Sequence, residues 1–107
     1  MKNKNDYGFY SGGYIFDRLD RAALNYLRKK WPDLQDKQVY TARSLVWFEH
    51  QLCDLNKTKV FLNSWECKDD NTYEINVTLR KVSIAIASGT FTFKVAKHNY
   101  CATNKGE

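Results

Sequence analysis

The chain has 107 residues, of which 43% are hydrophobic and 15% aromatic, so it is long enough for one folded domain and too apolar to be disordered. We therefore expect a single domain over residues 1–107. Lysine and arginine outnumber aspartate and glutamate by 17 to 12, a net charge of +5. This excess fits either a solvated surface or an anionic, phosphate-bearing ligand. Because the basic residues are scattered, and are densest only at residues 28–30, the pattern argues against a nucleic-acid groove.

No apolar run approaches the roughly 20 residues that cross a bilayer, and Met1–Tyr10 lacks the apolar core of a signal peptide. The sequence therefore predicts a cytoplasmic protein with no membrane partner. The cysteines, Cys53, Cys67 and Cys101, are widely spaced and form no Cys-x-x-Cys pair. Free thiols are favoured over a disulfide framework or a zinc site, and we expect no metal.

The periodicity of the chain predicts one helix followed by a sheet. Residues 1–12 are expected to be a loop and residues 13–30 a helix, which ends near Trp31 because the residue before a proline disfavours helical geometry. Alternating β-branched and aromatic residues then predict an antiparallel sheet over residues 39–97. Its four expected strands are 39–52, 57–67, 72–87 and 90–97, with a turn or bulge at Ser88–Gly89. Residues 98–107 are expected to be a tail, and the class is α+β.

The expected helix has one charge in an unexpected place. Spacing residues by 100° gathers a broad apolar arc, typical of a helix wrapped by a sheet. Its members are Ile15, Phe16, Leu19, Ala22, Ala23, Leu24, Tyr26 and Leu27. Asp20 lies inside this arc, where a carboxylate is costly unless it is paired or lines a cavity. Two interpretations stay open: an Asp at the edge of the arc that reaches water or an arginine, or a functional carboxylate. Gly12 and Gly13 at the helix start leave free N–H groups that can face a negative charge.

These residues together resemble a known family. Asn5, Gly8, Ser11 and the Gly12–Gly13 pair, with Asp20 seven residues further on, resemble the signature of hotdog-fold acyl-CoA thioesterases, in both the phenylacetyl-CoA thioesterase-like and the short-chain acyl-CoA hydrolase-like groups. The segments 41–48 and 87–93 resemble later strands of the family. The resemblance implies a hotdog fold, in which a curved antiparallel sheet of about four strands wraps one long central helix. Since the chain begins almost at the motif, it implies a short version without the family's first strand.

The resemblance also implies a mechanism and partners. Asp20 would be the general base or nucleophile that acts on a thioester carbonyl. The Gly12 and Gly13 N–H groups, from a partner chain, would stabilise the oxyanion, and Asn5 would position water or substrate. The substrate-binding candidates are Ser11, Thr41, Arg43, Arg80 and Lys81, with Lys57 as a further basic residue near a strand end. The implied substrate is an acyl-CoA, with no separate cofactor, bound by a homodimer, with a tetramer as the alternative.

Three alternatives to a thioesterase remain at the level of sequence. The first is a non-catalytic acyl-CoA-binding hotdog module or regulatory subunit. The second is a hotdog dehydratase, for which no histidine paired with a carboxylate is evident, and the third is a cystatin-like inhibitor, for which no inhibitory hairpin motif is evident. His50 and His98 are expected to be structural, and Trp31, Trp47 and Trp65 to be core or interface residues.

Overall fold

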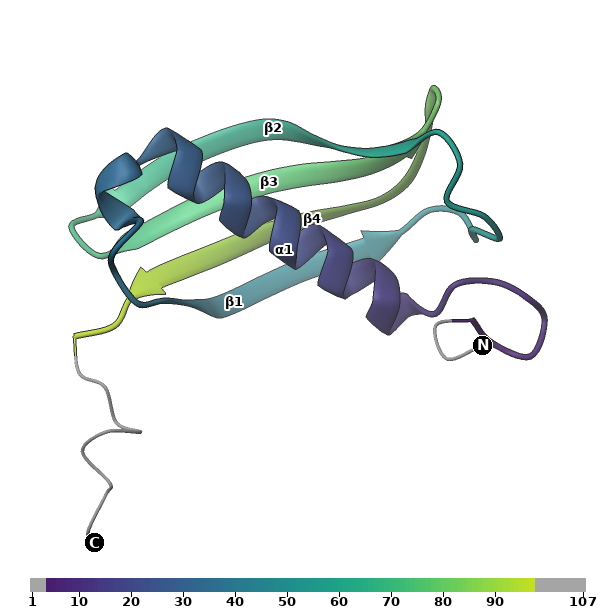
Figure 1. Ribbon diagram of the computed structural model, residues 1–107, viewed down its shortest axis with the longest axis horizontal. Coiled ribbons are helices and arrows are strands. Elements are labelled where there is room, and N and C mark those ends of the chain that lie inside the picture. Colours follow the sequence, from purple (N-terminus) through teal and green to yellow (C-terminus); the bar gives the residue numbers. More distant parts are fainter. Residues whose placement is uncertain (1–3, 98–107) are drawn as a thin grey trace, which may run out of the picture.

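The computed structural model describes residues 4–97 and shows one long helix lying along a four-stranded sheet (Figure 1). The elements in chain order are α1 (Gly12–Lys30), a short 3-10 helix (Pro32–Leu34), β1 (Val39–Phe48), β2 (Thr58–Asp69), β3 (Thr72–Lys81) and β4 (Ile84–Val95). All strand pairs are antiparallel, in the order β1-β4-β3-β2. The predicted α+β class and strand number are confirmed.

A capping serine sets the start of helix α1 and a following proline sets its end. The Ser11 hydroxyl accepts a hydrogen bond from the backbone N–H of Tyr14 at 3.2 Å, which caps the first turn. The helix ends at Lys30, one residue before Trp31, as the following proline predicts. One face is fully buried and consists of Ile15, Leu19, Ala23 and Leu27. These residues are four apart in sequence, as expected of one helix face, and all belong to the predicted apolar arc.

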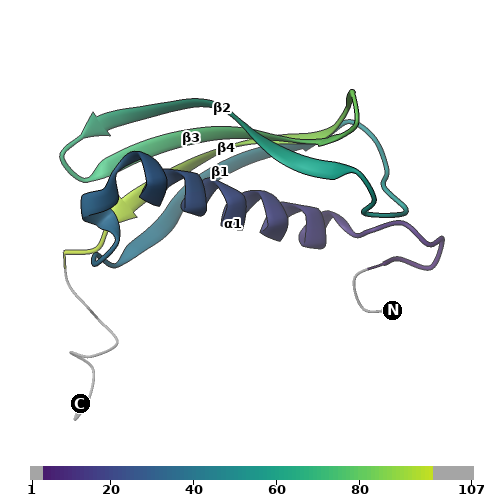
Figure 2. The same ribbon diagram turned by 45° about the horizontal axis from the view of Figure 1, so that its top comes forward.

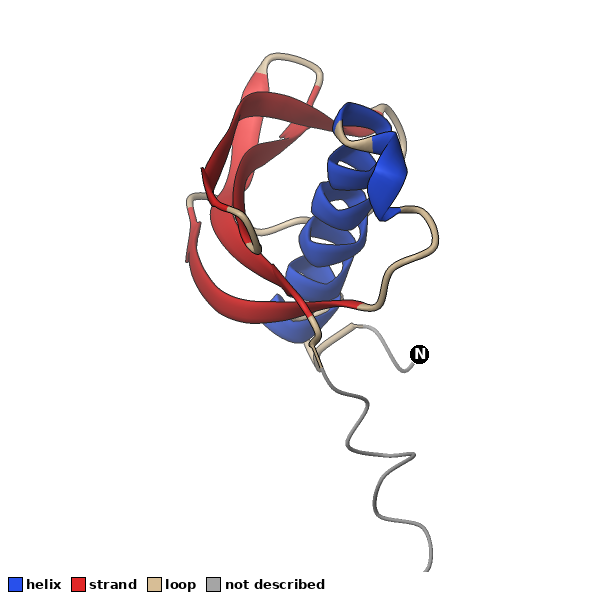
Figure 3. Cartoon of the chain, turned by 90° about the vertical axis from the view of Figure 1, so that its left-hand side faces the viewer, coloured by secondary structure: helices blue, strands red, loops and turns tan. Residues whose placement is uncertain are grey.

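The sheet curls around the helix, so that α1 occupies its concave side (Figures 2 and 3). Inward-facing residues of β3 and β4 make the core against the helix. They are Tyr73, Ile75, Val77, Leu79, Ala87, Phe91 and Phe93. The phenyl rings of Phe16 on α1 and Phe91 meet edge to face at 5.6 Å. Alternation of buried and less buried residues along β3 and β4 matches a sheet with one covered face.

The predicted boundary between the last two strands is wrong. Ser88 and Gly89 lie within β4, and the turn falls six residues earlier, at Val82–Ser83, where Lys81 pairs with Ile84. Gly89 is required by close packing instead of by a turn. A Cβ added there would lie 2.7 Å from the Phe91 ring and 3.0 Å from a methyl of Val46. The glycine therefore allows β1 and β4 to approach each other over the aromatic core.

Smaller differences concern the ends of the other strands. β1 ends at Phe48, four residues before the predicted end, because the chain turns away after Glu49 and His50 donate their backbone N–H groups to the Ile86 carbonyl. β2 and β3 form the predicted hairpin through Asp70–Asn71. Within residues 4–97 no strand precedes α1, and no helix there is long and apolar enough to cross a membrane. The predicted tail, with His98 and Cys101, lies outside the described residues.

The turn between β3 and β4 contains a strained residue, which yields a testable prediction. Val82 has a φ of 57°, in the left-handed region that costs a β-branched residue about 1–2 kcal/mol. Turns with positive φ at the first of two residues favour glycine there. We expect Val82→Gly to raise stability by about 0.5–1 kcal/mol, since the added backbone entropy of glycine offsets part of the gain. Thermal unfolding should show a midpoint roughly 2–6 °C higher.

Val82→Ala is the matched control for this prediction. It also removes the exposed valine methyls, which are part of a side chain that is 67% exposed, but it keeps a Cβ and therefore most of the strain. A rise in the alanine variant equal to that in the glycine variant would contradict the assignment of the strain to the backbone.

Candidate functional site

The carboxylate of Asp20 lies between helix α1 and strand β1. It is half-buried, and its Oδ1 accepts a hydrogen bond from the hydroxyl of Thr41 at 2.8 Å. Among the described residues it forms no ion pair, and its second oxygen has no hydrogen-bond partner. Among residues 4–97 Asp20 therefore has no arginine partner, and a hydroxyl fixes one of its oxygens and leaves the other available. An aspartate that reaches water at the edge of the arc and a functional carboxylate both stay predictions.

Strand β1 is irregular at this point. Its register on β4 shifts between Thr41, which pairs with Phe93, and Arg43, which pairs with Thr92, so Ala42 is the extra residue of a β-bulge. Bulges re-aim the side chains that flank them. The bulge borders an open hollow beside the carboxylate. Its lining residues are Phe16, Asp20, Thr41, Ala42, Arg43 and Ser44. Three predicted site residues, Asp20, Thr41 and Arg43, therefore line the same hollow. The Arg43 side chain has no ion-pair or hydrogen-bond partner within residues 4–97.

The predicted oxyanion donors lie at the head of the helix. Gly12 and Gly13 are exposed, and the Phe48 ring lies 3.6 Å from where a Cβ of Gly12 would be. Asp20 follows Gly12 by eight residues, which corresponds to about 12 Å along the axis at 1.5 Å per residue. A single carbonyl group cannot contact both the helix head and the carboxylate of the same chain.

Asn5 and Ser11 have local structural roles. The Asn5 side-chain oxygen accepts the backbone N–H groups of Tyr7 and Phe9 at 2.9 and 3.1 Å, which folds the loop before the helix. Ser11 uses its hydroxyl to cap α1. The structure shows what these two side chains hold in place, and their predicted contacts with substrate stay predictions.

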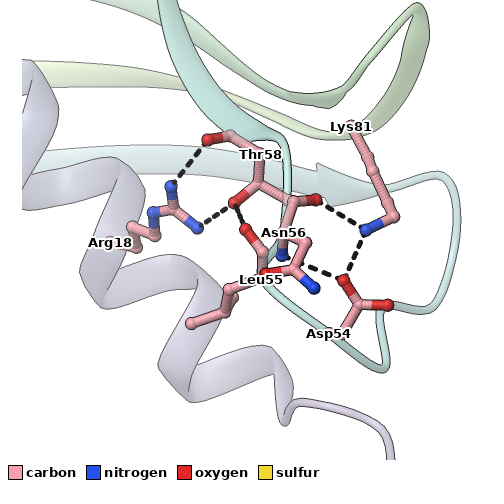
Figure 4. A network of polar contacts seen from close by, with 6 residues as sticks. All are labelled: Arg18, Asp54, Leu55, Asn56, Thr58 and Lys81. Atoms are coloured by element: carbon pink, nitrogen blue, oxygen red, sulfur yellow. Dashed lines mark hydrogen bonds and ion pairs between the residues drawn. The ribbon is translucent and has the colours of Figure 1, made fainter.

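Two of the predicted basic residues lie elsewhere, at the turn end of β3. The Lys81 ammonium contacts the Asp54 carboxylate and the Asn56 carbonyl, both at 2.6 Å (Figure 4). This hydrogen bond from Lys81 holds the pKa of the Asp54 carboxyl below its usual range. Arg80 donates to the Ser83 carbonyl at 3.3 Å. Lys81 therefore fixes the loop between β1 and β2, and neither residue lines the hollow at Asp20.

His50 and two of the cysteines lie within the described residues. The His50 ring Nδ1 lies 3.0 Å from the Ala85 carbonyl, which fits the predicted structural role. Cys53 and Cys67 are exposed free thiols, as expected. Residues 4–97 contain no cluster of three or more histidine, cysteine or acidic side chains able to hold a metal.

Strand β1 also exposes large apolar side chains, among them Trp47, which the sequence predicts to be a core or interface residue. Leu45 is 65% exposed, Phe48 49% and Trp47 42%. Leu45 and Trp47 pair with Thr90 and Ser88 of β4, on the sheet face away from the helix. β1 is an edge strand, so its outer backbone side has no strand partner among the described residues. Exposed apolar side chains on an open edge are typical of an association surface.

Solved structures with the same fold are numerous. A hypothetical protein from Aquifex aeolicus is 18% identical, with a TM-score of 0.71 over 91% of this chain and 92% of its own. A gentisyl-coenzyme A thioesterase is 16% identical, with a TM-score of 0.73 over 92% and 83%. A thioesterase from Thermus thermophilus, solved with coenzyme A and zinc, is 10% identical, with a TM-score of 0.74 over 91% and 73%.

These similarities establish the fold. The chain has the hotdog fold of these thioesterases, and the fold implied by the sequence motif is confirmed. No family model matches the chain, and no curated protein is similar to it in sequence. At identities of 18% or below, the arrangement of helix and sheet is shared, whereas the chemistry must be argued from the site itself.

Proposed function

We propose that the protein is an acyl-CoA thioesterase, which hydrolyses an acyl thioester to a free acid and coenzyme A. The observation that carries the proposal is the half-buried Asp20, which lines an open hollow, and whose Oδ1 is fixed by Thr41 while its second oxygen has no hydrogen-bond partner among the described residues. The solved thioesterases of the same fold, one of them with coenzyme A bound, support the choice of substrate class.

In the proposed reaction Asp20 acts on the thioester carbonyl, either directly or through a water molecule. If it acts as a base, it takes a proton from water, the hydroxide adds to the carbonyl carbon, and the C–S bond breaks to release the thiolate. If it acts as a nucleophile, an acyl-aspartyl anhydride forms first and water then hydrolyses it. Both routes consume one water and give one acid and one thiol. Both need a carboxylate oxygen free of other contacts.

The site is proposed to be completed by a second copy of the chain. The N–H groups of Gly12 and Gly13 would stabilise the oxyanion, but they lie about 10–12 Å along the helix from Asp20 of the same chain. A second copy paired through the β1 edge can bring its helix head to the hollow. The exposed Leu45, Trp47 and Phe48 support this edge as the contact, because burial of their apolar surface would favour pairing.

Arg43 is the basic residue best placed to contact substrate. It borders the hollow and has no partner within the described residues, whereas Lys81 and Arg80 are engaged in fixing nearby backbone. We propose that Arg43 contacts an anionic group of the bound acyl-CoA. The other two basic residues keep the β1–β2 loop and the β3–β4 turn in shape.

Thr41 provides a test of how the carboxylate is positioned. Thr41→Val keeps the shape of the side chain and removes the hydroxyl that bonds Asp20 Oδ1. A hydrogen bond to a charged group contributes about 1.5–3 kcal/mol, so we expect kcat to fall roughly 10- to 100-fold with little change in KM. Thr41→Ser restores the hydroxyl and should recover most of kcat. Equal losses in both variants would contradict the positioning role.

The proposal is tested by measuring hydrolysis of a panel of acyl-CoAs by the purified chain, with free thiol release as the readout. Calorimetric titration of coenzyme A should accompany the assay. Turnover of at least one thioester supports the enzyme. Binding of coenzyme A without turnover of any substrate would favour the acyl-CoA-binding module, and absence of both would reject either form of the proposal.

A further inference from the structure

The two edges of the sheet differ in a way that the fold alone does not require. Strand β2 is the edge strand opposite β1, so alternate residues direct their carbonyl groups away from the sheet. Two of these outward carbonyls, two residues apart, are those of Thr58 and Val60. Each accepts a hydrogen bond from a side chain of α1.

The contacts come from Arg18 and Tyr26. The Tyr26 hydroxyl donates to the Val60 carbonyl at 2.9 Å, and the Arg18 guanidinium donates to the Thr58 carbonyl at 3.4 Å. The guanidinium also donates to the Thr58 hydroxyl at 2.8 Å, and that hydroxyl in turn donates to the Leu55 carbonyl at 2.6 Å (Figure 4). The acceptors that an incoming strand would use are therefore occupied along the first part of β2.

The rest of β2 is interrupted by its own geometry. Its register on β3 shifts between Leu62 and Ser64 and again between Cys67 and Asp69. Each shift places a bulge on the edge strand, which bends it and breaks the straight ladder that another strand needs. In addition, the Lys30 ammonium covers the Trp65 ring at 3.9 Å from its centroid.

Strand β1, in contrast to β2, is regular over most of its length, and in the described part of the chain its carbonyls are not bonded by the helix. After its single bulge, residues 43–48 pair with β4 in unbroken register. Along this stretch Arg43 and Ser44 are exposed and polar, whereas the exposed side chains from residue 45 onward, those of Leu45, Trp47 and Phe48, are large and apolar. No helix side chain among residues 4–97 bonds to the backbone carbonyls of residues 43–48. A regular edge strand whose carbonyls are free, and which exposes large apolar side chains over its last four residues, is one to which another chain can add.

We infer that helix α1 closes the β2 edge through Arg18 and Tyr26, so that the sheet accepts a second chain only at β1. The occupant of β1 is a second copy of this chain, and this part rests on the proposed function. The closure of β2 is independent of the proposed function, because it follows from the hydrogen bonds of Arg18 and Tyr26. It limits assembly through the sheet edges to a closed pair, since a sheet open at both edges could extend indefinitely.

The test uses a background in which β1 is blocked. Leu45→Lys with Trp47→Lys places charges on that edge, and this protein should be a monomer by light scattering coupled to size exclusion. Adding Arg18→Met and Tyr26→Phe removes the caps and keeps the aliphatic stem and the ring. We expect self-association through β2 to rise about tenfold or more over the blocked background.

Two further variants make the result decisive. Arg21→Met in the same background is the matched control, because Arg21 forms an ion pair with Asp17 one turn away, bonds to no strand within residues 4–97, and has a side chain that is 78% exposed. It should leave the protein monomeric. Tyr26→Phe alone removes one oxygen atom and guards against unfolding, and it should give a smaller increase in association. The inference would be overturned if the variant with Arg18→Met and Tyr26→Phe is folded by circular dichroism but self-associates no more than the Arg21→Met control. This outcome does not depend on whether the chain hydrolyses thioesters.

Discussion

Replacing Asp20 by asparagine should lower kcat for acyl-CoA hydrolysis by about 10²–10⁴-fold, the range expected when a general acid–base group is lost. Asparagine has the same shape and its amide oxygen can still accept the Thr41 hydroxyl, so the hollow should keep its form. What it loses is the basicity and nucleophilicity of the second oxygen. Initial rates on the preferred acyl-CoA measure the effect, and the thermal midpoint should stay within a few degrees of the wild type.

Asp17 supplies the matched control. It lies on the same helix three residues earlier, is exposed, and forms an ion pair with Arg21 at 2.9 Å. Asp17→Asn changes the net charge by the same amount but leaves the hollow untouched, so its rates should equal those of the wild type. If Asp20→Asn and Asp17→Asn hydrolyse thioesters at the same rate, the carboxylate at position 20 is not the reacting group.

The helix and the fold class follow from local chemistry, which is why they could be predicted. The apolar repeat from Ile15 to Leu27 and the proline after Trp31 act within a few residues and define α1 almost completely. The β3–β4 turn could not be found in this way. Its first residue is Val82, a type that disfavours positive φ, whereas Ser88–Gly89 looks like a turn and is needed for packing under Phe91.

Of the candidate site, only those residues could be predicted that stand out in the local sequence pattern. Asp20 stands out because a carboxylate breaks an apolar arc, and its partner Thr41 lies 21 residues away, so no local pattern could pair them. The basic residues show most clearly what a local pattern cannot predict. Arg43 and Lys81 look alike in sequence, but a bulge brings the first to the hollow and an ion pair with Asp54 holds the second in a loop. Long-range contacts of this kind require the folded chain.

Blocking the β1 edge should remove both association and activity, because the proposed site needs groups from two chains. Leu45→Lys with Trp47→Lys puts two charges where a second copy would bury apolar surface, a standard way to prevent strand addition. We expect a folded monomer. Its kcat/KM should fall at least about 10²–10³-fold, the loss typical of a missing oxyanion donor, even though Asp20 and Thr41 are untouched.

Phe61→Lys tests whether the position of the charge matters. Phe61 is 40% exposed, close to the 42% of Trp47, and also lies on an edge strand, but on β2 at the opposite side of the sheet. This variant should keep the oligomeric state and the rate of the wild type. A wild-type chain that is active as a monomer, or a blocked β1 variant that remains a fully active dimer, would show that the site is complete within one chain. The helix head and Asp20 would then have to serve different steps, since about 12 Å of helix separates Gly12 from the carboxylate.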